Sequence, residues 1–443
     1  MHLIDLDLTI DEMTKVEGAA SVDVKIRSGV VESVKFGITE YKRFYTQAMR
    51  GKSITALPQL LARICGTCSN AHLLCSIEAC EHALGITPSP QTQILKRLTM
   101  YGLNIRDHAL HLYLFVAPDL RNKDNFLSFD EHDPIEHDML HDAFAIKAAG
   151  NHLAQIVAGR SVHGMYPAIG GFTKTPTQQE TQSIIKQLQE VRPRVLRLIK
   201  TFEQCDWKFD RTTKYMGMSA DHYSFLEGVI ISDTGQRIEE QDYHNHLEHV
   251  VIPYSQASGY KHDNECYMVG ALARVNLSKE KLHPNTKKDA NSAIALFPST
   301  NIYHNNLAQA IEILHCIDDA IDLLNNTQFK QEPLPKPVFR EAMGIGVVEA
   351  PRGMLYHRVH IDDNGIVMEG DIVVPTGQNQ INIEQDLKTL IQRLIDNDVE
   401  NKHEIQHEME KLIRAYDPCM SCASHFLKIN WIEKNNILTF SSL

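Results

Sequence analysis

RICGTCSNAH, residues 63–72, and DPCMSCASH, residues 417–425, stand near opposite ends of the chain and share one pattern. Each holds a Cys-x-x-Cys pair followed by a histidine, which gives two sets of candidate ligands: Cys65, Cys68 and His72, and Cys419, Cys422 and His425. A zinc knuckle closes its four ligands over a short stretch of sequence, whereas most of this chain separates the two pairs. Thiolates bind soft and borderline metals such as nickel, iron, copper and zinc. We therefore expect the fold to bring both ends of the chain to one buried metal centre.

The composition is that of an ordinary soluble globular protein, with 443 residues of which 43% are apolar and 23% charged. No long Pro/Gly/Ser linker or low-complexity run divides it, so we expect one domain over residues 1–443, with residues 206–275 as a peripheral lobe. The net charge of −12 and the absence of a long basic run argue against nucleic acid and anionic membranes as partners.

The N-terminal sequence MHLIDLDLTIDEMTK carries acids where a signal peptide needs a basic start and an apolar core. No run of about 18 apolar residues predicts a membrane span. Five further cysteines are scattered and are expected to be buried thiols, as in a reducing cytoplasm: Cys75, Cys80, Cys205, Cys266 and Cys316.

The hydrophobic patterns predict an α+β fold, a bundle of long helices around the metal centre with small flanking antiparallel sheets. Alternation over residues 19–38 and 344–374 predicts hairpins, with turns at Ser28-Gly29 and Asn364-Gly365. Thr175-Pro176 is expected to begin a helix, with Gln178 completing a capping box. A short helix near residues 238–247 and a tight turn at Gly170-Gly171 are also expected. The predicted long helical stretches are 54–62, 71–84, 91–115, 135–158, 175–203, 307–324, 382–396 and 402–415.

Taken together, the two cysteine motifs resemble the signature motifs of the large subunit of [NiFe]-hydrogenases, and the resemblance extends over nearly the whole chain. It implies that the first cysteine of each motif, Cys65 and Cys419, is a terminal nickel ligand. It also implies that Cys68 and Cys422 bridge nickel to iron. A zinc site made of the same four cysteines is the simpler alternative, but it does not account for the residues that flank them.

The iron of this family carries cyanide and carbon monoxide ligands, which need hydrogen-bond donors and an apolar wall. Glu349-Ala350-Pro351-Arg352-Gly353 resembles the family segment that supplies them, with Arg352 over the open face of the metals. Arg352 keeps its charge at any ordinary pH. Val374-Pro375-Thr376 resembles the segment that binds the second cyanide, with Thr376 as the donor.

Heterolytic cleavage of H2 releases a proton that needs a base. The resemblance gives this role to Cys419 and places Glu17 as the proton-relay glutamate, although Ala19 stands where the family more often has histidine. Asp107 and Asp417 resemble the carboxylates that flank the arginine. His72 is expected to hydrogen-bond a bridging sulfur.

Glu40 and His425 match the family's ligands of a separate magnesium or iron site near the C-terminus. In many members a dedicated protease cuts after this histidine once nickel is in place. Residues 426–443 resemble such a removable extension, and apolar residues such as Phe426, Leu427, Ile429 and Trp431 suggest that it packs against the body.

The resemblance implies an enzyme that catalyses H2 ⇌ 2H⁺ + 2e⁻. No cysteine set remains for an Fe–S cluster, so an Fe–S small subunit is expected to take the electrons. The short chain, HALHLYLF, NLAQAIEI and EAPRG look most like the cytoplasmic, NAD(P)-linked, sulfhydrogenase-type branch. That branch implies further Fe–S and flavin diaphorase subunits, nickel-insertion proteins and a maturation protease. The alternatives are a non-catalytic relative, like the quinone-site subunit of respiratory complex I, which lacks the four cysteines, or a structural zinc protein.

Overall fold

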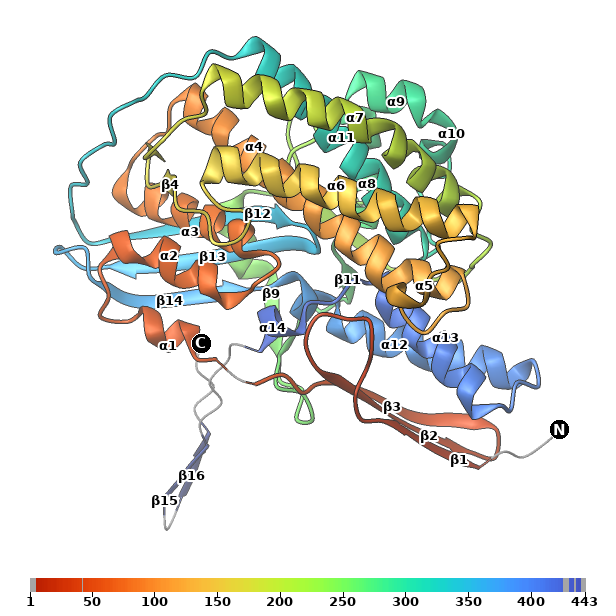
Figure 1. The fold of residues 1–443 in the computed structure, drawn as a ribbon. Coiled ribbons are helices and arrows are strands. Elements are labelled where there is room, and N and C mark those ends of the chain that lie inside the picture. The colour runs from red at the N-terminus through yellow and green to blue at the C-terminus, as the bar shows by residue number, and fades with distance from the viewer. Residues whose placement is uncertain (1–4, 42, 425–429, 434–435, 440–443) are drawn as a thin grey trace.

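The structure is a computed structural model that describes residues 5–41, 43–424, 430–433 and 436–439. A bundle of long helices makes up most of the molecule, and small sheets lie beside and below it in Figure 1. The sheets are antiparallel except where β11 pairs with β6. The α+β arrangement predicted from the sequence is confirmed.

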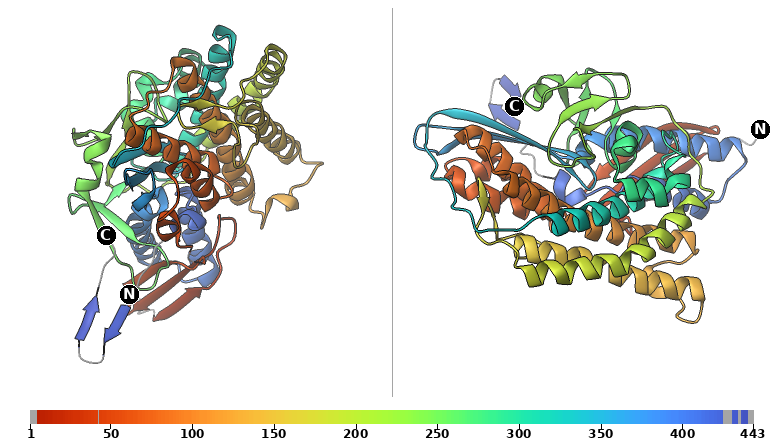
Figure 2. Two further views of the ribbon diagram at one scale, coloured as in Figure 1. Left: turned by 90° about the vertical axis from the view of Figure 1, so that its left-hand side faces the viewer. Right: turned by 90° about the horizontal axis from the view of Figure 1, so that it is seen from above.

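Four long helices form the bundle: α4 (Pro90–Leu110), α6 (Pro134–Ala158), α7 (Gln178–Glu203) and α11 (His304–Asn326). From above, α6 and α7 form an outer layer, and α4 and α11 lie between them and the rest of the molecule (Figure 2). The starts of α4 and α6 follow local signals. The side chains of Ser89 and Asp133 cap the first turns, and a proline takes the first helical position in both.

The start predicted for α7 is wrong by two residues. Thr177, not Thr175, is the N-cap: its hydroxyl accepts the Glu180 N–H at 3.2 Å, and the Glu180 carboxylate accepts the Thr177 N–H at 2.8 Å. The capping box therefore uses Glu180 in place of Gln178. A carboxylate accepts a backbone N–H more strongly than an amide oxygen does, which favours this register.

Helices α4 and α6 cross at unusually short range. A Cβ atom built on Gly150 would lie 2.6 Å from the backbone nitrogen of Arg106, a distance that real side chains do not reach. Glycine is therefore required at this crossing, which lies next to Asp107. The crossing fixes the part of α4 that faces the metal centre described below.

Two three-stranded sheets confirm the predicted hairpins. Strands β2 (Ala20–Arg27) and β3 (Val30–Ile38) turn at Ser28-Gly29, and β1 (Leu6–Ile10), which was not predicted, pairs with β2. Strands β12 (Ala342–Ala350), β13 (Gly353–Ile361) and β14 (Val367–Val373) form the second sheet, with Asn364-Gly365 in its last turn. This sheet packs on α3 (Ser69–Leu84), which ends at Leu84 as predicted and has Gly85 as its C-cap.

Residues 206–275 form short strands with a hydrophobic cluster of their own. The cluster includes Met216, Ile230 and Tyr243, and it is completed by Val347 and Tyr356 of the β12–β14 sheet. The short helix expected near 238–247 is a 3₁₀ helix, η5 (Glu240–His246). The strands are β6 (Lys214–Ser219), β7 (Val229–Ser232), β8 (Arg237–Ile238), β9 (Leu247–Val250), β10 (Gly259–His262) and β11 (Tyr267–Met268). The bounds of this lobe within a single domain stay a prediction.

The C-terminal third leads back to the first motif through α12 (Pro375–Asp396), α13 (Lys402–Ala415) and the single turn α14 (Met420–Ala423). Helix α12 begins seven residues before the predicted start, because Pro375 occupies its first position after the extended Val374. Strands β15 (Asn430–Glu433) and β16 (Asn436–Thr439) pair with each other. The packing expected for Phe426, Leu427 and Ile429 falls outside the described residues.

The shorter elements connect these parts: α1 (Tyr45–Met49), η1 (Ile54–Ala56), α2 (Leu57–Leu61), η2 (Ala62–Ile64), the π-helix η3 (His111–Val116), α5 (Ala117–Leu120), η4 (Phe126–Ser128), β4 (Pro167–Ala168), β5 (Gly171–Phe172), α8 (Ala271–Ser278), η6 (Lys279–Lys281), α9 (Pro284–Asp289) and α10 (Asn291–Ile294). Among the helices that the structure describes, none combines the length and apolar character needed to cross a membrane.

Candidate metal centre

The two cysteine motifs come from opposite ends of the chain and meet in the interior. Cys65 follows the short helical turns of residues 54–64, and Cys68 is the N-cap of α3. Cys419 is the N-cap of α14, and Cys422 lies within that turn. The positive end of the α3 dipole favours thiolates at this place.

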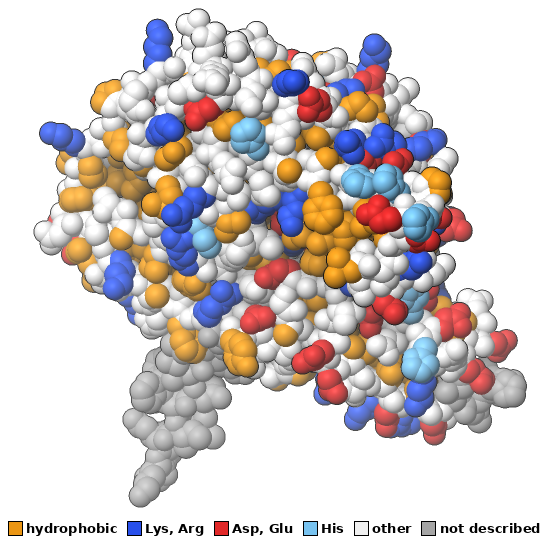
Figure 3. Space-filling model, viewed as in Figure 1, with side chains coloured by type: hydrophobic (Ala, Val, Ile, Leu, Met, Phe, Trp, Pro, Cys, Tyr) orange, Lys and Arg blue, Asp and Glu red, His pale blue; other side chains and the backbone are white. Residues whose placement is uncertain are grey.

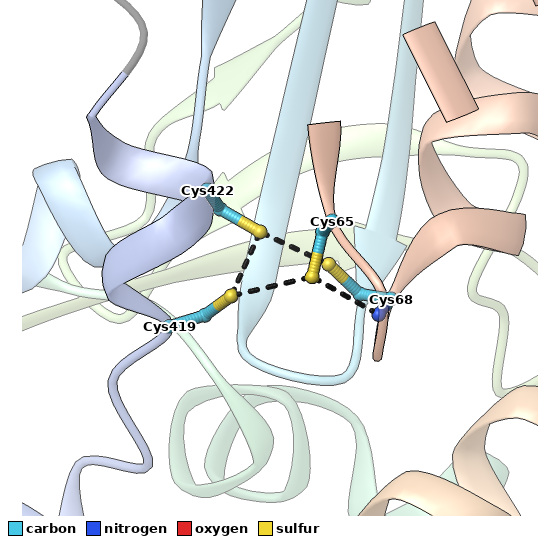
Figure 4. A group of neighbouring side chains, drawn as sticks. All are labelled: Cys65, Cys68, Cys419 and Cys422. Carbon is cyan, nitrogen blue, oxygen red and sulfur yellow. Dashed lines mark hydrogen bonds between the residues drawn. The ribbon is translucent and has the colours of Figure 1, made fainter. Parts of the chain in front are cut away.

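The four sulfur atoms lie within 4.8 Å of one another (Figure 4). The Cys68 and Cys422 sulfurs are 3.0 Å apart, those of Cys419 and Cys422 are 2.8 Å apart, and those of Cys65 and Cys419 are 3.5 Å apart. Sulfur ligands of one tetrahedral metal lie roughly 3.8 Å apart when metal–sulfur bonds are about 2.3 Å long. A small outward movement of the side chains would therefore admit metal ions.

The chemistry of the four thiols also fits a metal centre. All four are buried, and none takes part in a disulfide. Burial raises the pKa of the Cys419 and Cys422 thiols, whereas hydrogen bonds from the other three thiols lower the pKa of Cys65. Buried thiols give up their protons when a cation replaces them, so metal binding would release protons here. The donor set alone fits nickel, iron and zinc.

Arg352 holds a permanent positive charge beside the cysteines. It lies in the tight turn between β12 and β13, and its two terminal nitrogens donate to Asp107 at 2.6 Å and to Asp417 at 3.0 Å. Burial opposes the charge, but the two carboxylates outweigh it and raise the pKa of Arg352, with smaller contributions from Cys419 and Cys68. Asp417 adopts a positive φ of 49°, and its second oxygen accepts a hydrogen bond from Gln309 at 2.9 Å.

Two groups near the centre have hydrogen-bonding capacity that the described residues do not use. The Nε atom of Arg352 is buried and has no hydrogen-bond partner among them. The Thr376 hydroxyl accepts the Cys419 N–H at 2.9 Å, and its own hydrogen stays available for donation. Both groups fit small acceptor ligands on a metal held by the cysteines.

Glu17 is attached to the second motif. It forms a parallel β-bridge with Cys419, and its carbonyl oxygen accepts the Met420 N–H at 3.0 Å. Its carboxylate accepts the Ser421 N–H at 3.1 Å and the Ser421 hydroxyl. The carboxylate is therefore held close to the chain segment that carries Cys419 and Cys422.

Comparisons with known proteins show the family to which this chain belongs. The family model described as nickel-dependent hydrogenase matches residues 45–137 and 130–425. This chain belongs to the nickel-dependent hydrogenase family. It is 30% identical to the alpha subunit of sulfhydrogenase 1 from Pyrococcus furiosus, over 97% of this chain and all of the relative.

Two further relatives carry the hydrogenase name. The chain is 26% identical to the beta subunit of the NAD-reducing hydrogenase HoxS from Cupriavidus necator, over 95% of this chain and 94% of the relative. The fold matches the structure of an NAD⁺-reducing [NiFe]-hydrogenase in the H2-reduced state with a TM-score of 0.85, at 23% identity, over 95% and 99% of the two chains. The resemblance to the hydrogenase large subunit and to its sulfhydrogenase type is confirmed. These matches argue against the two alternative interpretations, a structural zinc protein and a non-catalytic homologue that lacks the four cysteines.

The expected second metal site of this hydrogenase is only partly described. Arg43 donates its backbone N–H to the Ser424 carbonyl at 2.9 Å, which attaches the segment after Glu40 to the second motif. A Cβ atom on Gly18 would lie 3.1 Å from the Glu40 carboxylate and 2.8 Å from the Met420 side chain. Glu40 thus lies beside the second motif, whereas His425 falls outside the described residues. The magnesium or iron site stays a prediction.

His72 lies one turn into α3, after the cysteines of the first motif. Its Nδ1 atom is 3.2 Å from the Nε2 atom of His357 on β13, and both rings are buried. A hydrogen-bonded histidine pair fixes the orientation of both rings. The expected hydrogen bond from His72 to a bridging sulfur stays a prediction.

Three residues that support the centre of the hydrogenase were not predicted. Arg106 donates to the Thr67 carbonyl inside the first motif and to the Ser161 carbonyl at 2.6 Å. Gln309 orients Asp417, and Ser421 holds Glu17. Ser421 stands within the second motif and Arg106 precedes Asp107, so their positions in the sequence could have identified them as candidate site residues. Gln309 lies within NLAQAIEI, where nothing marks it as different from its neighbours.

Proposed function

We propose that this chain is a hydrogenase catalytic subunit that catalyses H2 ⇌ 2H⁺ + 2e⁻ at a nickel–iron centre bound by its four motif cysteines. The observation that carries the proposal is the convergence of four buried thiols from both ends of the chain in a member of the nickel-dependent hydrogenase family. When bound, nickel and iron supply the redox chemistry and Lewis acidity that heterolytic cleavage of H2 requires.

The cysteines divide into two roles in this proposal. Cys65 and Cys419 would hold nickel as terminal ligands, and Cys68 and Cys422 would be shared between nickel and iron. All four sulfurs lie within 4.8 Å of one another, so the arrangement admits two bridging ligands, and the choice of Cys68 and Cys422 rests on their place as the second cysteine of each motif. His72, on the helix that follows Cys68, orients the bridging sulfurs.

The protein supplies the proton path. A terminal thiolate, Cys419, accepts the proton released from H2 and passes it toward the Glu17 carboxylate. The β-bridge between these two residues and the two hydrogen bonds from Ser421 support this step, because they hold the Glu17 carboxylate against the chain segment that carries Cys419. Glu17 is only half-buried, so it can pass the proton on toward solvent.

The iron carries cyanide and carbon monoxide ligands in this proposal. The unpaired Nε–H of Arg352 and the free hydrogen of the Thr376 hydroxyl are suited to donate to cyanide nitrogens. Pro351 and Pro375 lie next to these donors in the chain and contribute apolar surface. Asp107 and Asp417 hold Arg352 in place between them.

A magnesium or iron ion near the C-terminus is the second proposed metal, bound by Glu40 and His425. Oxygen and imidazole ligands together with waters suit such an ion. Removal of residues 426–443 after nickel insertion would leave His425 as the C-terminal residue. Nickel-insertion proteins and a maturation protease are the partners this step requires.

Electrons leave this chain through another subunit. Apart from the four motif residues, no group of cysteines in the described part of the chain could hold a metal cluster. An Fe–S small subunit is therefore the proposed first acceptor, and the similarity to an NAD-reducing hydrogenase supports NAD(P) as the final one, reached through Fe–S and flavin diaphorase subunits. We place the complex in the cytoplasm, where NAD(P) is available.

Substitution of a motif cysteine tests the proposed function. Cys65→Ser should abolish H2 oxidation by the purified complex with a redox dye and should lower its nickel content, because serine does not replace a thiolate on a soft metal. Cys205→Ser is the matched control, since Cys205 is half-buried and lies outside both motifs. Full H2 oxidation by the Cys65→Ser enzyme would contradict the proposal.

A further inference from the structure

A second group of metal-ligand side chains lies on the surface, far along the chain from the cysteine motifs. Glu131 precedes α6, and His137 and His141 lie within its first two turns. The four-residue spacing puts both imidazoles on one face of the helix. All three side chains are exposed, and their ligand atoms lie within 4.8 Å of one another. Figure 3 shows histidine side chains beside acidic ones at this end of the bundle.

The separations between the ligand atoms suit a single transition-metal ion. The Nδ1 atom of His137 lies 2.9 Å from a Glu131 oxygen, and the Nε2 atom of His141 lies 3.6 Å from the same oxygen. Ligand atoms of a tetrahedral zinc ion lie roughly 3.3–3.5 Å apart when its bonds to nitrogen and oxygen are about 2.0–2.1 Å long. The two imidazole rings are also close, with centroids 4.3 Å apart.

Glu131 differs from the acidic residues around it in its ion-pair partners. Arg121 forms ion pairs with Asp133 and Glu136, and Arg194 and Arg197 pair with Asp142. Among the described residues no lysine or arginine pairs with Glu131, whose only ion-pair contacts are the two histidines. Its negative charge is therefore available to a cation, and two neutral imidazoles can complete the ligand set.

A second cluster in the structure also combines two histidines with one carboxylate, but its charge environment is different. His246, His262 and Asp263 also lie within ligand distance of one another. There, however, the Lys214 ammonium is 3.1 Å from the Nδ1 atom of His262, so a positive charge already lies at the ligand atom. A metal cation would be repelled from that cluster.

We propose that Glu131, His137 and His141 bind one Zn²⁺ ion, which links the turn at residues 130–133 to the first two turns of α6. Water takes the remaining coordination position. Two imidazoles and one carboxylate are a ligand set that zinc accepts, whereas Mg²⁺ prefers oxygen ligands alone. The ion is separate from the catalytic centre and stabilises this end of the helix.

Zinc titration of the purified hydrogenase complex tests the proposal. The wild type is compared with His141→Gln and Glu131→Gln, and Mg²⁺ serves as a second probe. His407→Gln is the matched control, because His403 and His407 are an exposed pair with the same spacing on α13, and no described carboxylate, cysteine or third histidine joins them in a metal-ligand group. Loss of a group that only orients a ligand weakens metal binding by about 10- to 100-fold, so loss of a ligand itself should cost at least about tenfold.

The wild type and His407→Gln should bind one zinc ion with equal affinity, and zinc should raise their melting temperatures by equal amounts. His141→Gln and Glu131→Gln should bind it at least about tenfold more weakly and show a smaller rise in melting temperature. Mg²⁺ can bind at the site proposed for Glu40 and His425, so any rise in melting temperature that it causes should be equal in all four proteins. The proposal is overturned if the two cluster variants match the wild type in zinc binding, if His407→Gln loses the ion, or if the two cluster variants lose a response to Mg²⁺ that the wild type shows.

Discussion

We expect the Glu17→Gln substitution to block proton transfer and to leave the structure of the metal centre intact. A glutamine keeps the size and shape of glutamate, and its carbonyl oxygen can still accept the Ser421 N–H that Glu17 accepts at 3.1 Å. Its amide group can donate to the Ser421 hydroxyl oxygen, so both contacts survive with their polarity rearranged. The backbone bridge to Cys419 does not involve the side chain. We therefore expect the variant to fold and to retain its metals.

The expected loss of activity is much larger than the expected loss of stability. A positioned general acid or base contributes about 10²–10⁴-fold, which is about 2.7–5.4 kcal/mol at about 1.36 kcal/mol per tenfold change in rate. Two hydrogen bonds to a carboxylate become neutral ones, each weaker by about 1 kcal/mol, and partial exposure reduces this further. A domain stable by about 5–15 kcal/mol stays folded after a loss of about 1–2 kcal/mol.

Isotope exchange between D2 and solvent protons is the assay, with nickel content measured on the same sample. Glu17→Gln should lower the exchange rate by about 10²–10⁴-fold at unchanged nickel content. Glu32→Gln is the control, because Glu32 is an exposed glutamate on β3 that lies outside both cysteine motifs. Exchange at the wild-type rate in Glu17→Gln would show that the proton leaves by another path.

Three further outcomes follow from the structure. Arg352→Lys replaces two hydrogen bonds to buried carboxylates with one, so thermal unfolding should show a free energy of unfolding lower by about 1.5–3 kcal/mol. The same variant should oxidise H2 more slowly. An unchanged melting temperature would contradict the role of the Asp107–Arg352–Asp417 contact. Gly150→Ala places a methyl group against the α4 backbone and should destabilise the protein by about 1–3 kcal/mol, and equal stability in urea unfolding would show that the two helices can separate without cost. Intact-mass measurement on active, nickel-loaded enzyme should give a chain that ends at His425, whereas a mass that includes Leu443 would make the tail a permanent part of the fold.

Local signals in the sequence predicted most of the long helices. Ser89 and Asp133 cap α4 and α6 by contacts within one turn, and Gly85 ends α3 at a positive φ, so these bounds depend on neighbouring residues alone. The five residues of β1 alternate between apolar and polar, which is a strand signal, but so short a run did not decide the element without its pairing with β2. The lobe at 206–275 was equally hard to interpret, because its cluster is completed by residues of β12–β14 that lie far away in the chain.

The candidate site likewise contains residues that the sequence predicted and residues that it did not. The cysteines, Arg352, Asp107 and Asp417 stand in motifs whose residues are recognisable one by one, and the structure brings them together. Arg106, Gln309 and Ser421 act through single hydrogen bonds to other elements, and such contacts depend on packing that no short stretch of sequence specifies.

Metal analysis combined with infrared spectroscopy of the purified protein tests the central claim most directly. The wild type should contain nickel and iron, and the region of cyanide and carbonyl stretching vibrations should show bands from the iron ligands. Cys422→Ser should lose the nickel and those bands, because Cys422 is proposed to bridge both metals. Zinc as the only metal at the four cysteines, with no bands in that region, would contradict the account.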